Sequence, residues 1–313
     1  MTDSVTAFAP ASIGNLGVGF DVLGLALEGV GDRVIAERTD GDGVAIEEVR
    51  GLDGNIHPYL STDPQSNTAS IAAEALWSVH GKGGVSLKIH KGVPLQSGMG
   101  SSAASAVAAV VAVNALLDSP LPVESLLPYA LEGEKFASGG LHADNVAPSL
   151  MGGMILCPEA LLPDTVRIAT PDGVSAVLLH PELQVNTAEA RRLLGKGVRM
   201  HDWITQQGYL AGFIAACQTS NIDLIGRTLR DIIIEPQRAG NVSCFEPVKR
   251  AAEAAGALGT SLSGSGPSIF ALCRSGQARN LATAMEQACR GEGVDCQTWI
   301  SPMDAVGAHI EAS

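Results

Sequence analysis

A segment rich in glycine and serine near residue 100 carries the residue types of a phosphate-binding loop. Between an expected strand and an alanine-rich stretch, the chain reads Pro94-Leu95-Gln96-Ser97-Gly98-Met99-Gly100-Ser101-Ser102-Ala103-Ala104. Gly98 and Gly100 have no side chains, so backbone N–H groups there can approach a ligand closely. The serines can cap a helix and offer hydroxyls, and a helix N-terminus adds partial positive charge. The segment therefore predicts a polyphosphate site, the alternative being an ordinary glycine turn with a serine cap.

This loop departs from two common nucleotide-binding patterns. A Walker-type loop places Lys directly before its Ser or Thr after the second glycine, whereas here Ser101 follows Gly100. The third glycine of a dinucleotide fingerprint is also absent, because Ala103 follows Ser102. Neither pattern accounts for this segment.

Two further blocks complete a resemblance to a known family. They read Pro10-Ala11-Ser12-Ile13-Gly14-Asn15-Leu16-Gly17-Val18-Gly19-Phe20-Asp21 and Gly259-Thr260-Ser261-Leu262-Ser263-Gly264-Ser265-Gly266-Pro267-Ser268. With the loop, they make the chain similar to the GHMP kinases, whose members phosphorylate galactose, homoserine, mevalonate and phosphomevalonate. The resemblance spans residues 10 to 268. It implies an α+β fold, with an N-terminal domain like the second domain of ribosomal protein S5 and a ferredoxin-like C-terminal domain.

Within this family, the sequences of several blocks are similar to those of the members that act on homoserine. These blocks are Leu23-Gly24-Leu25-Ala26-Leu27, Leu141-His142-Ala143-Asp144-Asn145-Val146-Ala147-Pro148, Asn186-Thr187-Ala188-Glu189-Ala190-Arg191 and Glu235-Pro236-Gln237-Arg238. The implied activity is transfer of the γ-phosphoryl group of ATP to the side-chain hydroxyl of L-homoserine, with Mg²⁺, in threonine biosynthesis. The alternatives are a family member acting on an isoprenoid or sugar alcohol, a catalytically dead nucleotide-binding regulator, and an RNA-binding protein suggested by the S5-like fold.

The resemblance also implies which residues hold the two substrates. Asn15 and Asp21 would hold the ammonium end of homoserine. Arg191 and Arg238 would hold its carboxylate, since a guanidinium matches a carboxylate in a fork geometry. The loop from Pro94 to Ala104 would bind ATP, with two flanking residues near the adenine, Asn67 and Lys91. The remaining expected substrate contacts are His142, Asn145, Gly264, Ser265 and Gly266.

Glu134 and the neighbouring pair Asp144 and Asn145 are the expected catalytic residues, together with Ser102. By family position, Glu134 and the hydroxyl of Ser102 (Ser101 being the alternative) would bind Mg²⁺, which favours hard oxygen ligands. Asp144 and Asn145 compete for the place where mevalonate kinases have an aspartate that takes the hydroxyl proton. If Asn145 faces the hydroxyl, the proton can pass directly to a phosphate oxygen, because a loose transition state gains little from early deprotonation.

Segments of strand and helix character alternate along the chain and must position these residues. Strands are expected at 5–8, 34–37, 85–89, 154–157, 176–179, 268–272 and 298–300. Helices are expected at 68–80, 103–117, 123–136, 187–194, 203–217, 247–255 and 277–290. A proline-containing stretch, 158–171, predicts a joint between an N-terminal domain at 1–164 and a C-terminal domain at 165–313.

Composition excludes several broad classes. Hydrophobic residues make up 46% of the chain and charged residues 17%, which excludes a disordered protein. A net charge of −13 and 4% aromatics disfavour nucleic-acid binding. The longest apolar stretch, Ala103 to Leu117, is too short to span a membrane, and no secretory signal opens the chain, so we expect a cytoplasmic protein. The six cysteines form no C-x-x-C pair and are expected in the core. The family resemblance also implies a homodimer.

Overall fold

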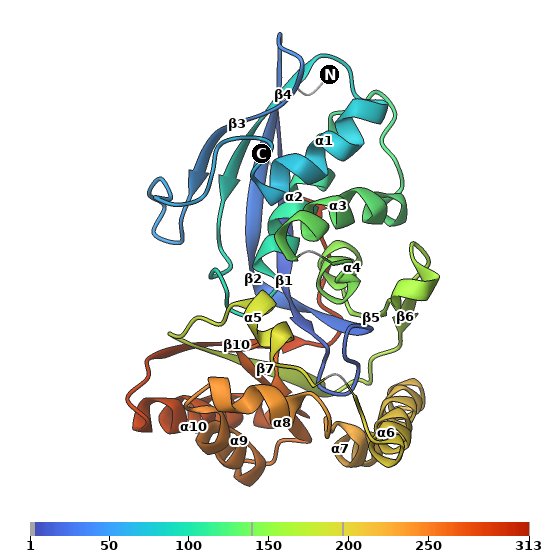
Figure 1. Cartoon of the computed structure of the whole chain (residues 1–313), viewed down its shortest axis with the longest axis vertical. Coiled ribbons are helices and arrows are strands. Elements are labelled where there is room, and N and C mark those ends of the chain that lie inside the picture. The colour runs from blue at the N-terminus through green and yellow to red at the C-terminus, as the bar shows by residue number, and fades with distance from the viewer. Residues whose placement is uncertain (1–3, 139, 196, 313) are drawn as a thin grey trace.

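Two sheets, one in each half of the chain, form the frame of the molecule (Figure 1). A computed structural model describes residues 4–138, 140–195 and 197–312. The first sheet has the strand order β11-β1-β2-β4-β3, with β5 added beside β2 and β6 beside β5. The second sheet has the order β10-β7-β9-β8 and is antiparallel throughout. Mixed strands and helices in both halves make an α+β architecture.

The first sheet is built around two long strands. Its members are β1 (Ser4–Gly14), β2 (Leu23–Thr39), β3 (Gly43–Arg50), β4 (Gly84–His90), β5 (Met154–Leu156), β6 (Val166–Ile168) and β11 (His309–Ile310). β1 and β2 pair antiparallel, with an irregularity between Pro10 and Ser12. β3 and β4 pair parallel. The segment between β1 and β2 is thereby held at one end of the sheet, where the second half of the chain packs.

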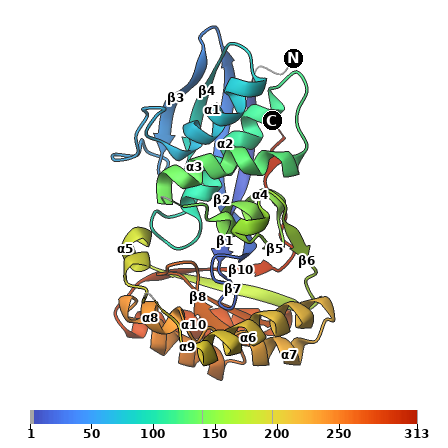
Figure 2. The ribbon, with the colours of Figure 1, turned by 45° about the vertical axis from the view of Figure 1, so that its right-hand side comes forward.

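Four helices cover one face of this sheet (Figures 1 and 2). They are α1 (Thr68–His80), α2 (Ser101–Ala115), α3 (Leu127–Ser138), preceded by the short 3₁₀ helix η1 (Val123–Leu126), and α4 (Ala143–Met151). α2 is buried from Ala103 to Asn114 and contacts β1, β2 and the other three helices. Its alanines and valines allow this close approach on all sides, because small side chains pack without voids. The helix that follows the glycine-rich loop is therefore the central element of this half.

The second half packs helices on both faces of its sheet, because Val177 and Ala271 cluster with residues 245–289, whereas Leu178 and Leu272 cluster with residues 213–229. Its strands are β7 (Val174–Pro181), β8 (Gly259–Leu262), β9 (Ile269–Arg274) and β10 (Cys296–Pro302). Its helices are α5 (Thr187–Arg192), α6 (Met200–Gln218), α7 (Ile222–Thr228), α8 (Glu235–Arg238), α9 (Phe245–Ala254) and α10 (Ala278–Gly291). Short 3₁₀ turns lie at Glu159–Leu161, Ala239–Asn241 and Ser275–Gln277.

The two halves share one hydrophobic cluster. Leu16 and Leu25 of the first half pack in the same buried group as Phe213 and Phe270 of the second. The chain also crosses back: β6, which follows residue 164, pairs with β5, and β11 near the C-terminus pairs with β1. The domain boundary between residues 164 and 165 stays a prediction. The first strand after this boundary, β6, pairs with β5 and so belongs to the first sheet.

Two expectations drawn from composition can be compared directly with the structure. All six cysteines are buried and unpaired, as expected for core residues. In the part of the chain that the structure describes, no helix combines the length and the apolar character that a membrane span requires.

Candidate active site

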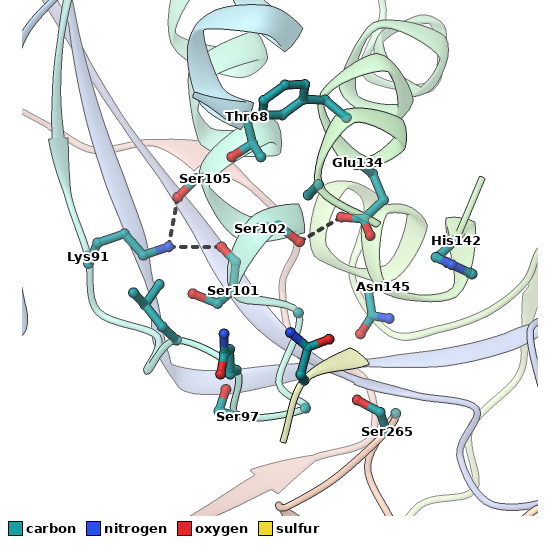
Figure 3. A pocket seen from close by; sticks show the side chains of 18 of the residues that line it. Thr68, Lys91, Ser97, Ser101, Ser102, Ser105, Glu134, His142, Asn145 and Ser265 are labelled. Atoms are coloured by element: carbon teal, nitrogen blue, oxygen red, sulfur yellow. Dashed lines mark hydrogen bonds between the residues drawn. The ribbon is translucent and has the colours of Figure 1, made fainter. Parts of the chain in front are cut away.

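A cavity of about 510 Å³ opens between the two halves, and most of the predicted site residues line it. Figure 3 shows the part of its wall formed by α2, α3 and α4. The predicted residues that line it are Asn15, Asp21, Asn67, Lys91, Leu95, Gln96, Ser97, Gly98, Gly100, Ser101, Ser102, Glu134, His142, Asp144, Asn145, Arg191, Arg238, Gly264 and Ser265. The predicted residues outside its lining are Pro94, Met99, Ala103, Ala104 and Gly266.

The glycine-rich loop packs backbone to backbone against the C-terminal glycine block. Gly98 has a φ of +74°, and a Cβ there would lie 2.7 Å from the carbonyl oxygen of Gly266, so no other residue fits without strain. The hydroxyl of Ser263 donates to the Gly98 carbonyl at 2.6 Å, and the N–H of Ser268 donates to the Ser97 carbonyl at 3.1 Å. The second half of the chain thus supports the loop directly.

Helix α2 begins at this loop in the manner of an anion site. Its N-cap is Gly100, at φ +68°, and no side chain caps the helix. An uncapped first turn leaves backbone N–H groups that need acceptors, and the aligned peptide dipoles favour negative charge there. Because this end of α2 lines the cavity, it suits the phosphates of a nucleotide.

Ser102 and Glu134 meet across α2 and α3 (Figure 3). The Ser102 hydroxyl donates to a Glu134 carboxylate oxygen at 2.7 Å, and Glu134 is 5% exposed. The described residues contain no cluster of three or more His, Cys, Asp or Glu that suits a metal. A single carboxylate with a hydroxyl fits magnesium at a nucleotide, since that ion completes its shell with waters and phosphate oxygens.

Asp144 and Asn145 lie side by side in α4 but contact different segments. The Asn145 side-chain oxygen accepts the hydroxyl of Ser12 at 3.0 Å, and a Cβ at Gly100 would lie 3.1 Å from it, so Asn145 borders the phosphate loop. Asp144 is buried; its Oδ2 accepts the N–H of Asn15 at 3.0 Å, while its Oδ1 has no partner. Burial, followed by the charge of Asp21, raises the pKa of Asp144 to about 7.

The segment between β1 and β2 is strained where it lines the cavity. Asn15, Leu16 and Asp21 all have positive φ (66°, 42° and 58°), which is uncommon outside glycine. The Asn15 amide ties the segment together: its oxygen accepts the N–H of Asp21 and its nitrogen donates to the carbonyl of Gly264, both at 3.0 Å. Such strain persists only where the surroundings enforce it, and it clusters at functional sites.

The two predicted arginines meet at this strained segment. Arg191 pairs with the carboxylate of Asp21 through two nitrogens, one at 3.2 Å, and that hydrogen bonding raises the pKa of Arg191. Arg238 is 3% exposed and donates to the Gly264 carbonyl at 3.0 Å, but its Nε has no partner. Both guanidinium carbons lie near the ring centroid of Phe20, at 5.6 Å for Arg191 and 5.1 Å for Arg238.

Only one of the two arginines forms an ion pair with a described carboxylate. Asp21 is the only carboxylate that forms an ion pair with either arginine among the described residues, and His142 lies 3.7 Å from it. Burial lowers the pKa of His142, so the imidazole adds no charge at neutral pH. Asp144 and Asp231 also act on Arg238 electrostatically, but neither pairs with it directly, so the buried Arg238 is suited to bind a further anionic group.

Asn67 and Lys91, predicted near adenine, have their polar atoms engaged within the protein. The Asn67 oxygen caps α1 by accepting the N–H of Ala69, and its nitrogen donates to the Ser61 carbonyl. The Lys91 amine contacts Asp32.

Sequence reasoning missed the apolar lining residues Val49, Leu60, Ile89 and Phe136, because isolated apolar side chains carry no signal that separates them from core residues.

Comparison with known proteins identifies the family. Models of the GHMP kinases N terminal domain and of GHMP kinases C terminal match residues 67–153 and 213–291. A homoserine kinase of Xanthomonas campestris pv. campestris is 41% identical over 309 residues, covering 98% of this chain and 94% of that protein. Another, of Chloroherpeton thalassium, is 41% identical over 319 residues, covering 98% and 99%.

A solved structure agrees with these matches. The crystal structure of homoserine kinase from Cytophaga hutchinsonii has a TM-score of 0.94 and 40% sequence identity, and the match covers 99% of this chain and 98% of that one. The expected α+β fold with N- and C-terminal GHMP kinase domains is therefore confirmed. The chain belongs to the homoserine kinase family of the GHMP kinases.

Proposed function

We propose that this protein transfers the γ-phosphoryl group of ATP to the side-chain hydroxyl of L-homoserine, giving O-phospho-L-homoserine. One observation carries the acceptor assignment: Arg238 is almost fully buried, has an unpartnered Nε and forms no ion pair with a described carboxylate. Burial lowers the pKa of Arg238 although the carboxylates of Asp21, Asp231 and Asp144 act in the opposite direction, so its place on the cavity wall favours a directly bound anionic ligand. The α-carboxylate of an amino acid supplies that anion.

The acceptor's ammonium group finds suitable partners in the same place. Asp21 carries a carboxylate and Asn15 a side-chain oxygen, both on the strained segment that lines the cavity. Asp21 pairs with Arg191. A zwitterionic substrate can replace this pair. Its carboxylate would bind Arg191 in place of Asp21, and its ammonium group would bind Asp21 in place of Arg191.

The phosphate end of the cavity provides the groups that phosphoryl transfer requires. The uncapped first turn of α2 and the glycine-rich loop offer backbone donors to the phosphates. Ser102 and Glu134 would hold Mg²⁺, which supplies neutralisation of the developing phosphate charge when bound. Holding the hydroxyl in line with the γ-phosphate accounts for much of the remaining catalysis.

We further propose that no side-chain base takes the hydroxyl proton. Asn145 borders the phosphate loop, and an amide cannot act as a base. Asp144 also lines the cavity, but its Oδ2 accepts the N–H of Asn15, so its role in this proposal is to brace the strained segment. The proton then passes to a phosphate oxygen as the bond to phosphorus forms, consistent with a loose transition state.

A panel of acceptors tests the assignment. ADP release is measured with MgATP and L-homoserine, 3-aminopropan-1-ol (homoserine without its carboxylate), mevalonate or galactose. We expect L-homoserine to have the highest kcat/KM, with loss of the carboxylate lowering it by about 30-fold or more. A higher kcat/KM for mevalonate or galactose would replace the homoserine assignment with another acceptor of this family. If the protein binds ATP but phosphorylates none of these acceptors, a catalytically dead nucleotide-binding regulator would be favoured.

A further inference from the structure

A buried charged cluster lies beneath the phosphate loop and takes no part in the chemistry described so far. It consists of Asp32 of β2, Lys91 just after β4 and Ser105 of α2, which are 0%, 8% and 4% exposed. Lys91 and Ser105 line the cavity, whereas Asp32 does not. Its Oδ2 accepts the Lys91 amine and, at 2.6 Å, the Ser105 hydroxyl. The cluster is therefore a closed, desolvated network rather than a surface ion pair.

The network joins the two ends of the loop. At the entering end, Asp32 Oδ1 accepts the N–H groups of Gly92 and Val93 at 2.8 and 3.0 Å. At the leaving end, the Lys91 amine donates to the carbonyl of Ser101 at 2.8 Å (Figure 3). A further bond closes the ring, since the Ser101 hydroxyl donates to the Val93 carbonyl at 3.0 Å. The residues between these ends, 94–100, are the glycine-rich loop itself.

Stability alone is a poor explanation for this arrangement. Burying two charges costs desolvation that their attraction often fails to recover, and well-packed apolar residues in such a place are frequently neutral or better. Apolar residues, however, cannot hold individual backbone N–H and C=O groups in fixed directions. Here the carboxylate and the amine bind three backbone groups at the loop ends, which sets how the loop and the first turn of α2 face the cavity.

We propose that Asp32, Lys91 and Ser105 are positioning residues that fix the phosphate loop in the geometry that binds the triphosphate of ATP. The inference rests on the proposed function only for its nucleotide and is independent of the acceptor. Because the network binds the backbone of the loop ends, it sets affinity for the phosphates more than affinity for the nucleoside. It tunes KM for ATP and, through the placement of the γ-phosphate, kcat.

Direct binding measurements on the intact protein test this. Asp32→Asn keeps an acceptor for the loop N–H groups but removes the charge that holds Lys91. Kd values for MgATP and for adenosine are measured by calorimetry, and unfolding is followed by circular dichroism. We expect Asp32→Asn to weaken MgATP by about tenfold or more, because a charge-assisted network is lost, while Kd for adenosine stays within about twofold. Ser105→Ala, which keeps the ion pair, gives a smaller loss of about threefold.

A matched control lies on the same strand. Glu37 of β2 pairs with Lys88 of β4 at the surface, at 3.5 Å, so Glu37→Gln removes a similar charge from the same pair of strands without touching the loop. Equal losses of adenosine and MgATP affinity, or unchanged MgATP affinity in folded Asp32→Asn and Ser105→Ala, would overturn the positioning role. If Asp32→Asn fails to fold, Ser105→Ala alone decides between these outcomes. A wild-type protein that binds no MgATP would instead refute the proposed function.

Discussion

The proposed nucleotide end and the proposed acceptor end of the cavity are built in opposite ways. The nucleotide end is one continuous stretch, the loop and the start of α2, closed at its base by buried hydrogen bonds. The acceptor end is assembled from separate segments around residues 15–21, 142–145, 191, 238 and 264. Its contacts are made by side chains, and Arg191 is 43% exposed. In the proposed assignment, phosphate binding depends on backbone groups of one segment, which β2 and the second half hold in place, whereas acceptor recognition depends on side chains that several segments bring together.

The two arginines repeat this contrast on a smaller scale. Arg238 is buried and holds the carbonyl of Gly264, so its direction is fixed before any ligand binds. Arg191 is half-exposed and already paired with Asp21. A buried and a half-exposed cation near one acceptor should differ in how much activity their loss costs, and the variants below use that difference.

The largest effect is expected from removing the metal carboxylate. A bound metal supplies several kcal/mol of transition-state stabilisation, so Glu134→Gln should lower kcat by about a hundredfold or more and raise the magnesium needed for activity. Initial rates over a magnesium titration measure both, with thermal unfolding to check the fold. Glu132→Gln, at an exposed position on the same helix, is the control. Wild-type rates in Glu134→Gln at ordinary magnesium would show that Glu134 is not a ligand.

The next effect separates the two arginines. Truncating one partner of a buried charged pair costs about 2–5 kcal/mol, so Arg238→Ala should lower kcat/KM for homoserine by about 30- to several-thousand-fold. Arg191→Ala should lie at the lower end, because water already screens its charge. KM for ATP should barely change in either variant. Exposed Arg192 provides the control, as Arg192→Ala.

The carboxylate-free analogue sharpens this prediction. If the arginines recognise the carboxylate, Arg238→Ala should narrow the gap in kcat/KM between homoserine and 3-aminopropan-1-ol. A variant that loses as much activity on the analogue as on homoserine would mean that Arg238 does not contact the carboxylate. The assignment of the acceptor would then lose its main chemical support.

A smaller effect is expected from Phe20, whose ring lies near both guanidinium groups. Cation–π contacts contribute about 0.5–2 kcal/mol depending on burial, so Phe20→Leu should raise KM for homoserine by about 3- to 30-fold and leave KM for ATP unchanged. Steady-state kinetics with each substrate varied in turn measure this. The control is Phe8→Leu, which removes a similar contact with Arg33, 4.9 Å from the ring, away from the cavity. Equal KM values for homoserine in the two variants would exclude a role for Phe20.

The last prediction concerns pH and Asp144, whose pKa is raised to about 7 from 3.8. Between these values the folded protein binds a proton that the unfolded chain releases, so the carboxyl lowers stability progressively as pH rises from about 4 to 7. Asp144→Asn removes this ionisation. Its Tm relative to wild type should therefore increase from pH 5 to pH 8, as thermal scans at several pH values would measure. A constant difference in Tm across that range would contradict the assignment.

The same variant tests transfer without a base. We expect Asp144→Asn to disturb substrate KM, through the brace on Asn15, while the pH profile of kcat between about pH 6 and 8 keeps its shape. An ionisation in the wild-type kcat profile that disappears in Asp144→Asn would identify Asp144 as the general base. Direct transfer to phosphate would then be wrong.

Elements with strong local patterns were predicted well. α1 was predicted as Thr68 to His80, its observed bounds, because its apolar residues recur with helical spacing. β4 differed by one residue at each end, since its residues alternate clearly. α4 was missed: it has nine residues and contains Pro148, which argues against a helix in isolation. β1 and β2 were predicted only in part, because glycines and a proline interrupt their patterns.

By itself, the sequence predicted a phosphate site at the glycine-rich loop. Its glycines, serines and following helix indicate that chemistry locally, because backbone groups of neighbouring residues would form the site. Only the tertiary structure decided the rest. It buried Arg238, turned the Lys91 amine toward Asp32, and brought Arg191 to Asp21 across 170 residues of chain. Burial and pairing of a charge depend on segments that meet only when the halves pack, and no local pattern encodes that meeting.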